Sequence, residues 1–181
     1  NGDGMLTPGR YEAGQWFITN AAVNSPQWEG YAAFGGEPTD VPVVGFIDGD
    51  KRSDIGIFRN GTWTWQVTKG DTPAPVVFGQ AGDVPVVGDW NGDGRSDIGF
   101  VRQGRWNLRI TGLERKPRGL DKSITVQWTK REGTAVLSFV FGSFGDLPVV
   151  GDWNRDEVPD LFLGWDRVGG INLRVLFGGA R

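Results

Sequence analysis

One repeated segment constrains most strongly what this chain can fold into. Residues 83–88 read Asp-Val-Pro-Val-Val-Gly, and close copies stand at 40–45 and 146–151. Each copy is a short apolar run that ends at a Gly and leads into a loop rich in Asp and Asn. Short apolar runs bounded by turn residues are typical of strands, and a segment that recurs at intervals indicates a repeat architecture. The chain is therefore predicted to consist of several copies of one β unit.

The loop after the middle copy, residues 89–97, is the candidate metal site. It places side-chain oxygens at Asp89, Asn91, Asp93 and Asp97. Alternate residues of a tight loop can face one centre, and a ligand set made only of oxygen suits a hard cation, Ca²⁺ best of all. The chain has no Cys and no His, so no softer ligand competes.

The other copies of this loop keep the pattern to different degrees. The loop at 152–160 has all four positions, but Glu157 stands where Gly94 eases the turn. In the loop at 46–54, Phe46 replaces the first ligand. A metal-free turn is the alternative for every copy, because Asn, Asp and Gly favour turns for backbone reasons alone. The opening copy at 1–7 is predicted to be empty. The further candidate ligands are Asp152, Asn154, Asp156 and Asp160 in the last loop and Asp48, Asp50 and Asp54 in the second.

Each unit also contains a hairpin signal and ends on Phe-Gly. Asn60-Gly61 is the strongest two-residue turn signal, and Trp16, Trp63 and Trp106 follow three such turns at one position, which favours packing. The Phe-Gly steps are predicted to pack one unit against the next. The period is 43 residues from Pro42 to Pro85, enough for four short strands. The units run roughly over 1–35, 36–79, 80–142 and 143–181.

The third unit carries an insertion near 111–131 that is rich in Lys and Arg. Its simplest interpretation is a solvated, elongated hairpin. The functional alternative is a contact for an anionic glycan or an acidic surface. The residues proposed for such a contact are Arg115, Lys116, Arg118 and Trp128.

These repeats resemble the FG-GAP/VCBS family, which occurs in integrin α-subunit propellers and in many secreted bacterial proteins. The resemblance rests on Phe78-Gly79, on residues 83–94 and on Asp97, and it covers the chain outside the insertion. It implies an all-β fold, a β-propeller of four-stranded antiparallel blades, as a four-bladed ring or an arc of a larger ring. It also implies Ca²⁺ in the loops, with the carbonyl oxygens of Arg95 and Val158 as additional ligands. Phe46 departs from the pattern.

Composition excludes several classes of function. A net charge of −3 gives no support for nucleic-acid binding, and no apolar run approaches the length of a membrane span. Without His or Cys, and with no paired carboxylates outside the repeated loops, the sequence shows no catalytic constellation. We therefore expect a protein that is not an enzyme.

The leading expectation is a Ca²⁺-stabilised binding or adhesion module of an extracellular protein, whose ligand is a protein or a glycan. Loops with few carboxylates bind Ca²⁺ weakly and would fill only in calcium-rich surroundings. One alternative is a lectin. Another is a structural subunit that forms a homo-oligomer through an incomplete terminal blade. A less favoured alternative is an accessory domain of a secreted enzyme.

Overall fold

The computed structural model describes residues 9–18, 29–50, 52–67, 70–113, 125, 127–151, 160–167 and 170–176. Within them the chain forms strands and turns and no helix, as the sequence predicts for an all-β fold. The strands are β1 (Gly9–Glu12), β2 (Gln15–Ile18), β3 (Glu29–Ala33), β4 (Asp40–Gly45), β5 (Asp54–Arg59), β6 (Thr62–Gln66), β7 (Val76–Val77), β8 (Val84–Gly88), β9 (Asp97–Arg102), β10 (Arg105–Thr111), β11 (Gln127–Arg131), β12 (Thr134–Val140), β13 (Leu147–Gly151), β14 (Asp160–Arg167) and β15 (Gly170–Leu176).

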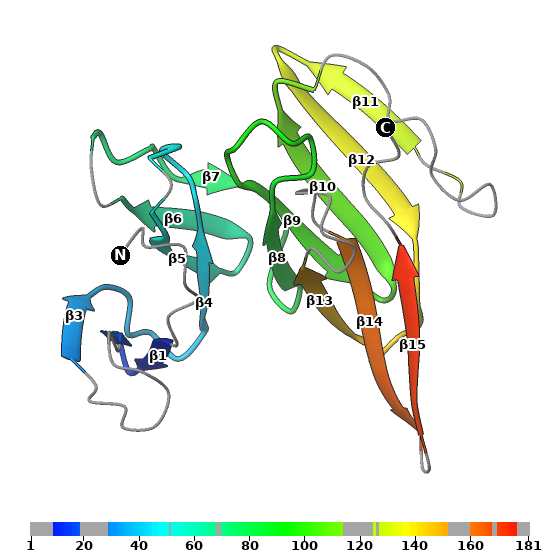
Figure 1. The fold of residues 1–181 in the computed structure, drawn as a ribbon, viewed down its shortest axis with the longest axis horizontal. Coiled ribbons are helices and arrows are strands. Elements are labelled where there is room, and N and C mark those ends of the chain that lie inside the picture. The colour runs from blue at the N-terminus through cyan, green and yellow to red at the C-terminus, as the bar shows by residue number, and fades with distance from the viewer. Residues whose placement is uncertain are drawn as a thin grey trace.

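The strands form four antiparallel sheets that follow one another along the chain (Figure 1). We name them sheet A (β1-β2-β3), sheet B (β4-β5-β6-β7), sheet C (β11-β12-β10-β9-β8) and sheet D (β13-β14-β15). In the described residues only sheet B has the four strands expected of every unit. Sheet C has five, because the insertion adds β11 beside β12, and β12 pairs with β10 as the fourth strand of the unit.

A repeated clamp closes each of the first three units. Asn60 and Gly61 both have positive φ, 50° and 90°, which forms the tight turn that the Asn-Gly pair predicts. The N–H of Phe78 then donates to the carbonyl of Gly61 at 2.8 Å, and the indole N–H of Trp63 donates to the carbonyl of Phe78 at 2.8 Å. The same pair of bonds recurs at Phe34, which joins Gly14 and Trp16, and at Phe141, which joins Gly104 and Trp106.

The clamp explains why Gly61 is required. A Cβ at this position would collide with the carbonyl oxygen of Gly79. The Phe-Gly step is therefore a main-chain lock on the hairpin turn as well as an apolar contact, which the sequence alone did not indicate.

Successive sheets pack through the residues on their inner strands. Phe78 at the end of sheet B meets Phe100 of sheet C edge-on, with 5.0 Å between ring centroids. Ile98 of sheet C joins Phe58 and Trp63 of sheet B in one buried cluster. The first strands of sheets B, C and D also touch in sequence, β4 with β8 and β8 with β13. The prediction that the Phe-Gly steps pack one unit on the next is confirmed for sheets B and C.

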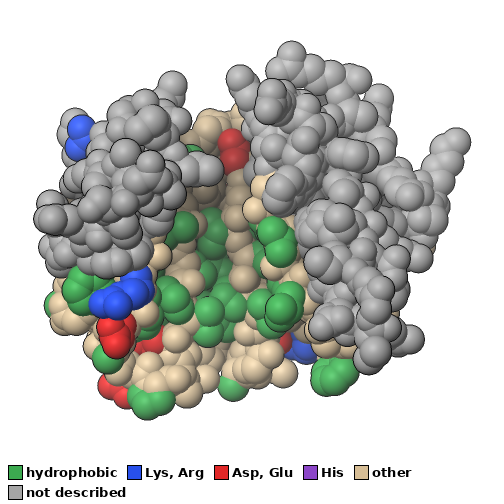
Figure 2. All heavy atoms as spheres, turned by 60° about the horizontal axis from the view of Figure 1, so that its bottom comes forward, with side chains coloured by type: hydrophobic (Ala, Val, Ile, Leu, Met, Phe, Trp, Pro, Cys, Tyr) green, Lys and Arg blue, Asp and Glu red, His purple; other side chains and the backbone are tan. Residues whose placement is uncertain are grey.

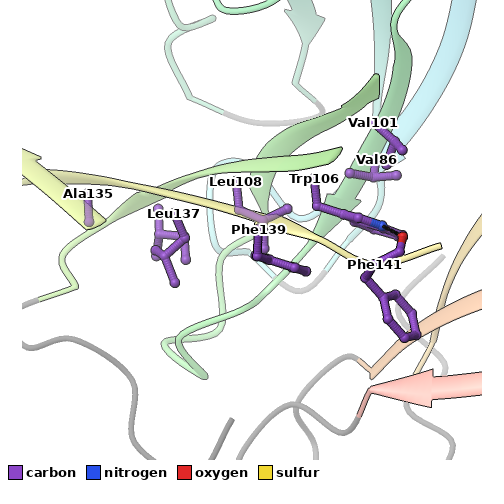
Figure 3. Packing of buried hydrophobic residues seen from close by; sticks show 9 residues of the cluster. Val86, Val101, Trp106, Leu108, Ala135, Leu137, Phe139 and Phe141 are labelled. Atoms are coloured by element: carbon purple, nitrogen blue, oxygen red, sulfur yellow. Dashed lines mark hydrogen bonds between the residues drawn. The ribbon is translucent and has the colours of Figure 1, made fainter. Parts of the chain in front are cut away.

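The largest buried cluster lies on one face of sheet C (Figure 3). Trp106 and Ala135 are completely buried, and Leu108, Leu137 and Phe139 complete a layer between β10 and β12. Val150 of sheet D packs against this layer, as does Trp128 of β11. The predicted packing role of the recurring Trp residues is confirmed, since Trp16, Trp63 and Trp106 are 6%, 0% and 0% exposed.

The first strands also carry exposed apolar side chains. Val41, Val84 and Leu147 occupy one position in β4, β8 and β13 and are 39%, 39% and 69% exposed. Figure 2 shows hydrophobic side chains gathered in the hollowed middle of one face of the described surface. The described residues include no helix that is long and apolar enough to cross a membrane.

Candidate metal centre

The loop between β8 and β9 is organised by its first carboxylate. One oxygen of Asp89 accepts the N–H groups of Gly92 at 2.8 Å and Asp93 at 3.0 Å. The other oxygen accepts the N–H of Gly94 at 2.7 Å. Three backbone donors are thus wrapped around one side chain, which holds the tip of the loop in a tight turn.

The middle of the loop is tied to the end of β10. The side-chain amide of Asn91 donates to Asp93 at 2.9 Å and to the carbonyl of Thr111 at 2.8 Å. Asp93 in turn accepts the N–H of Arg95 at 2.9 Å. Sequence reasoning missed the part played by Thr111, because this residue lies outside the acidic loop and acts through its backbone.

Asp97, the last carboxylate of the loop, lacks a partner for one oxygen. The residue is 7% exposed, and its Oδ1 accepts the N–H of Thr111 at 3.0 Å. Its Oδ2 is buried and has no hydrogen bond within the described part of the chain. Burial is the main cause that raises the pKa of Asp97 to about 7; the backbone N–H groups of Thr111 and Trp90 oppose it, and the charges of Asp93 and Asp89 add to it. A buried carboxylate oxygen without a donor is expensive unless a proton or a cation meets it.

These residues fit a hard cation in chemistry but are not gathered into a cage. The candidate ligand atoms are all oxygens. The buried Oδ2 of Asp97 has no hydrogen-bond donor among the described residues, and the negative charges of Asp93 and Asp89 repel the charge of this carboxylate, so a cation would be favourable there. Among the described residues, however, no three acidic side chains lie close enough together to enclose a metal ion. Asp89 is turned toward backbone donors instead. The ligand set of this loop therefore stays a prediction.

The loop between β4 and β5 is built differently. Asp54 is fully buried, and its Oδ2 accepts the N–H of Ile47 at 2.9 Å. Asp48 accepts the N–H of Asp50 at 2.9 Å and has a second, buried oxygen with no hydrogen bond among the described residues. Phe46 stands at the position equivalent to Asp89; it is 43% exposed and supplies no carboxylate. In this loop the last carboxylate, Asp54, accepts the backbone N–H groups at the start of the loop.

The two loops are joined to each other. The N–H of Phe46 donates to the hydroxyl of Ser96 at 3.0 Å, and the N–H of Ser96 donates to the carbonyl of Phe46 at 2.9 Å. Beside this junction is an open pocket of about 480 Å³, whose lining includes Asp48, Asp50 and Arg95. The acidic loops of neighbouring sheets therefore form one continuous region.

Most of the remaining predicted site residues lie outside the described residues. Asp160 opens β14, and its side chain lies outside the description, as do Asp152, Asn154, Asp156 and Val158. The basic residues Arg115, Lys116 and Arg118 and the opening loop at 1–7 also lie outside the described residues. Trp128 is described: it is half-buried on β11 and packs against the core of sheet C, so most of its side chain serves packing.

Sequence reasoning missed a second use of carboxylates. Asp40 binds the guanidinium of Arg59 through both of its oxygens, at 2.5 and 3.0 Å, and Asp83 binds Arg102 in the same way at 2.6 Å. Asp83 also accepts the N–H of Gln80, which ties the turn after Phe-Gly to the next strand. The sequence contains an indication of this pairing, because an Arg follows each of these Asp residues by 19 positions.

Comparison with known proteins found no matching family model, no matching curated protein and no matching solved structure.

Proposed function

We propose that this chain is a non-catalytic, calcium-binding module of an extracellular protein, built of FG-GAP/VCBS-like repeats that form the blades of a β-propeller. The propeller arrangement is supported by the way sheets B, C and D touch through their first strands, β4, β8 and β13, which would line the central axis of a ring or arc. The partner of such a module would be a protein or a glycan, bound outside the cell.

One observation carries the calcium proposal: the buried Oδ2 of Asp97 has no hydrogen bond to any described residue, in an all-oxygen loop that also contains Asp89 and Asp93. A divalent cation would remove this deficit and the mutual repulsion of the carboxylates. Asp89, Asn91, Asp93, the carbonyl of Arg95 and Asp97 would hold the ion. Its role would be to fix the connection between β8 and β9, and through Ser96 the neighbouring loop of sheet B.

Thermal unfolding in Ca²⁺ and in EDTA tests this proposal. Free Ca²⁺ at 10 to 100 times its Kd should stabilise the fold by about 1.4–2.7 kcal/mol for one site. In a domain of this size that is a rise of about 3–10 °C in Tm. Mg²⁺ at the same concentration should raise Tm much less, because it demands a smaller and more regular oxygen cage.

The variant Asp97→Asn isolates the site. Asn keeps the acceptor for the Thr111 N–H and removes the unpartnered charge, so its Tm in EDTA should match or exceed that of the unmodified protein. Its rise in Ca²⁺ should disappear. Glu132→Gln, an exposed residue with the same change of charge, should keep the full rise. Equal Tm values in Ca²⁺ and EDTA for the unmodified protein would sink the proposal.

A further inference from the structure

The two faces of sheet C differ in character. One face carries the buried layer of Trp106, Leu108 and Leu137 and turns toward β13. The opposite face begins apolar at β9, where Ile98 and Phe100 contact sheet B. From β10 outward it becomes mainly polar, with side chains that range from half-buried to exposed and with Val136 and Val140 of β12 among them.

The register of the outer strands assembles this polar face. Asn107 of β10 pairs with Ser138 of β12, which pairs with Gln127 of β11, so the three side chains form one row across the sheet. Strand alternation places two further residues of β10 and the last residue of β11 on the same side. We name this side the outer face of sheet C. Its residues with charged or strongly polar side chains are Arg105, Asn107, Arg109, Gln127, Arg131 and Ser138, and Thr111, Thr129, Thr134, Val136 and Val140 stand between them on the same side.

The three arginines of this face lack strong counter-charges among the described residues. Arg105 and Arg109 take part in no ion pair there, whereas Arg59 and Arg102 are each held by a buried Asp. Arg131 meets only Glu132 of the adjoining turn, at 3.5 Å, and both side chains are more than four-fifths exposed. Such a pair is strongly screened by water and salt. The face is therefore cationic on a chain whose net charge is −3.

The spacing of the charges indicates an extended partner. Arg105 and Arg109 are four residues apart on one strand, which is about 14 Å. Arg131 lies two strands away from β10 and is displaced by two residues from Arg109, which is about 12 Å. These distances suit a chain molecule whose anionic groups meet the guanidinium groups one by one. A planar guanidinium forms paired hydrogen bonds with carboxylate or sulfate groups.

We propose that the outer face of sheet C binds a linear anionic polysaccharide. The guanidinium groups of Arg105, Arg109 and Arg131 contact its carboxylate or sulfate groups, and Asn107, Gln127 and Ser138 offer hydrogen bonds to sugar hydroxyls. The strands β10, β12 and β11 place no aromatic side chain on the outer face, and Phe100 of the neighbouring β9 is buried against sheet B, although stacking on aromatic rings is the usual means of holding single-stranded nucleic acid. This inference rests on the proposed function as a binding module and names the chemistry of its partner.

Binding of polygalacturonate and heparin to immobilised protein in saturating Ca²⁺ tests the inference, with neutral dextran and a single-stranded oligothymidylate beside them. The variant Arg105→Gln/Arg109→Gln/Arg131→Gln should bind at least one of the two polyanions about tenfold or more weakly. Binding by the unmodified protein should weaken as salt rises from 50 to 300 mM, since these contacts are exposed. The matched variant Arg10→Gln/Arg52→Gln/Lys130→Gln removes the same charge away from the face and should bind normally.

The outcomes separate this inference from the calcium proposal. Both triple variants should keep the rise in Tm caused by Ca²⁺, which shows that the fold and the loop at 89–97 are intact. If neither polyanion binds while that rise is present, the inference is overturned and the calcium proposal stands. Equal loss of binding in the two triple variants, or tighter binding of oligothymidylate than of either polyanion, also overturns it. Which polyanion is preferred distinguishes carboxylate from sulfate recognition.

Discussion

The acidic loops of sheets B and C share one sequence pattern. They differ in which carboxylate accepts the backbone N–H groups of the loop: the first one in sheet C and the last one in sheet B. In sheet C the first carboxylate, Asp89, accepts three backbone N–H groups at the loop tip, and the last, Asp97, has a buried oxygen without a donor among the described residues. In sheet B the first position is Phe46, and the last carboxylate, Asp54, has turned to the N–H groups at the start of the loop. Each loop leaves one buried carboxylate oxygen without a hydrogen bond among the described residues, on Asp97 in sheet C and on Asp48 in sheet B, so the two loops differ in which carboxylate is open to a cation.

The largest effect is expected from Asp54→Ala. This change leaves the buried N–H of Ile47 without its acceptor, so the free energy of unfolding should fall by about 2–3 kcal/mol. The loss should be equal in Ca²⁺ and in EDTA, measured by urea unfolding, because Asp54 acts as an internal acceptor. Asp71→Ala, an exposed residue of the same unit, should change little. A clearly greater loss in Ca²⁺ would mean that the loop of sheet B also binds the ion, and the contrast between the loops would fail.

The next effect comes from making the loop of sheet C like that of sheet B. Asp89→Phe removes the carboxylate that gathers the tip, so the stabilisation by Ca²⁺, about 1.4–2.7 kcal/mol, should vanish. Asp89→Asn keeps one acceptor oxygen and should lose only part of it. Calorimetric titration of Ca²⁺ into each protein checks this. Undiminished Ca²⁺ affinity in Asp89→Phe would show that the first carboxylate of the loop is not needed for Ca²⁺ binding.

The reverse exchange should give a smaller effect of opposite sign. Phe46→Asp adds a fourth carboxylate to the loop that already has Asp48, Asp50 and Asp54. In EDTA the added charge should lower Tm, and in Ca²⁺ the variant should gain about 1 kcal/mol over its EDTA value beyond the gain of the unmodified protein. Phe46→Asn, which removes the apolar ring without adding charge, should show no such gain.

The smallest effect concerns carboxylates that are already paired. The hydrogen-bonded guanidinium of Arg59 is the main cause that holds the pKa of Asp40 below its usual range. A carboxyl with a lowered pKa contributes stability above its unfolded value, near pH 4, and that stability is lost as pH falls through the folded value. Arg59→Gln should therefore move the midpoint of acid unfolding to higher pH. Arg10→Gln, which breaks only an exposed pair with Glu12, should leave the midpoint unchanged.

The sequence predicts the repeat, the strands and the packing aromatic residues because these depend on local patterns. Asn60-Gly61 specifies its turn directly, and the recurrence of Trp63 and Trp106 marks buried positions. The alternation in the insertion indicates which side chains share a face, but it cannot say that β11 pairs with β12 at the edge of sheet C. That choice depends on contacts between strands distant in sequence.

The candidate site is only partly predictable for the same reason. Spacing identifies the oxygens of the loop at 89–97, and it does not reveal that Asp89 turns to backbone N–H groups or that Thr111 holds Asn91 and Asp97. The pairs of Asp40 with Arg59 and Asp83 with Arg102 show that some carboxylates of the repeat serve the fold. Composition gives no means of separating these roles.

The most direct measurement is a crystal structure grown in excess Ca²⁺, with density examined at Asp97. We expect an ion at about 2.3–2.6 Å from the Oδ2 of Asp97, with oxygens of Asp89, Asn91 and Asp93 and the carbonyl of Arg95 completing six to eight ligands. Density for solvent alone beside Asp97, with Asp89 still bound to the N–H groups of Gly92 and Gly94, would contradict the account.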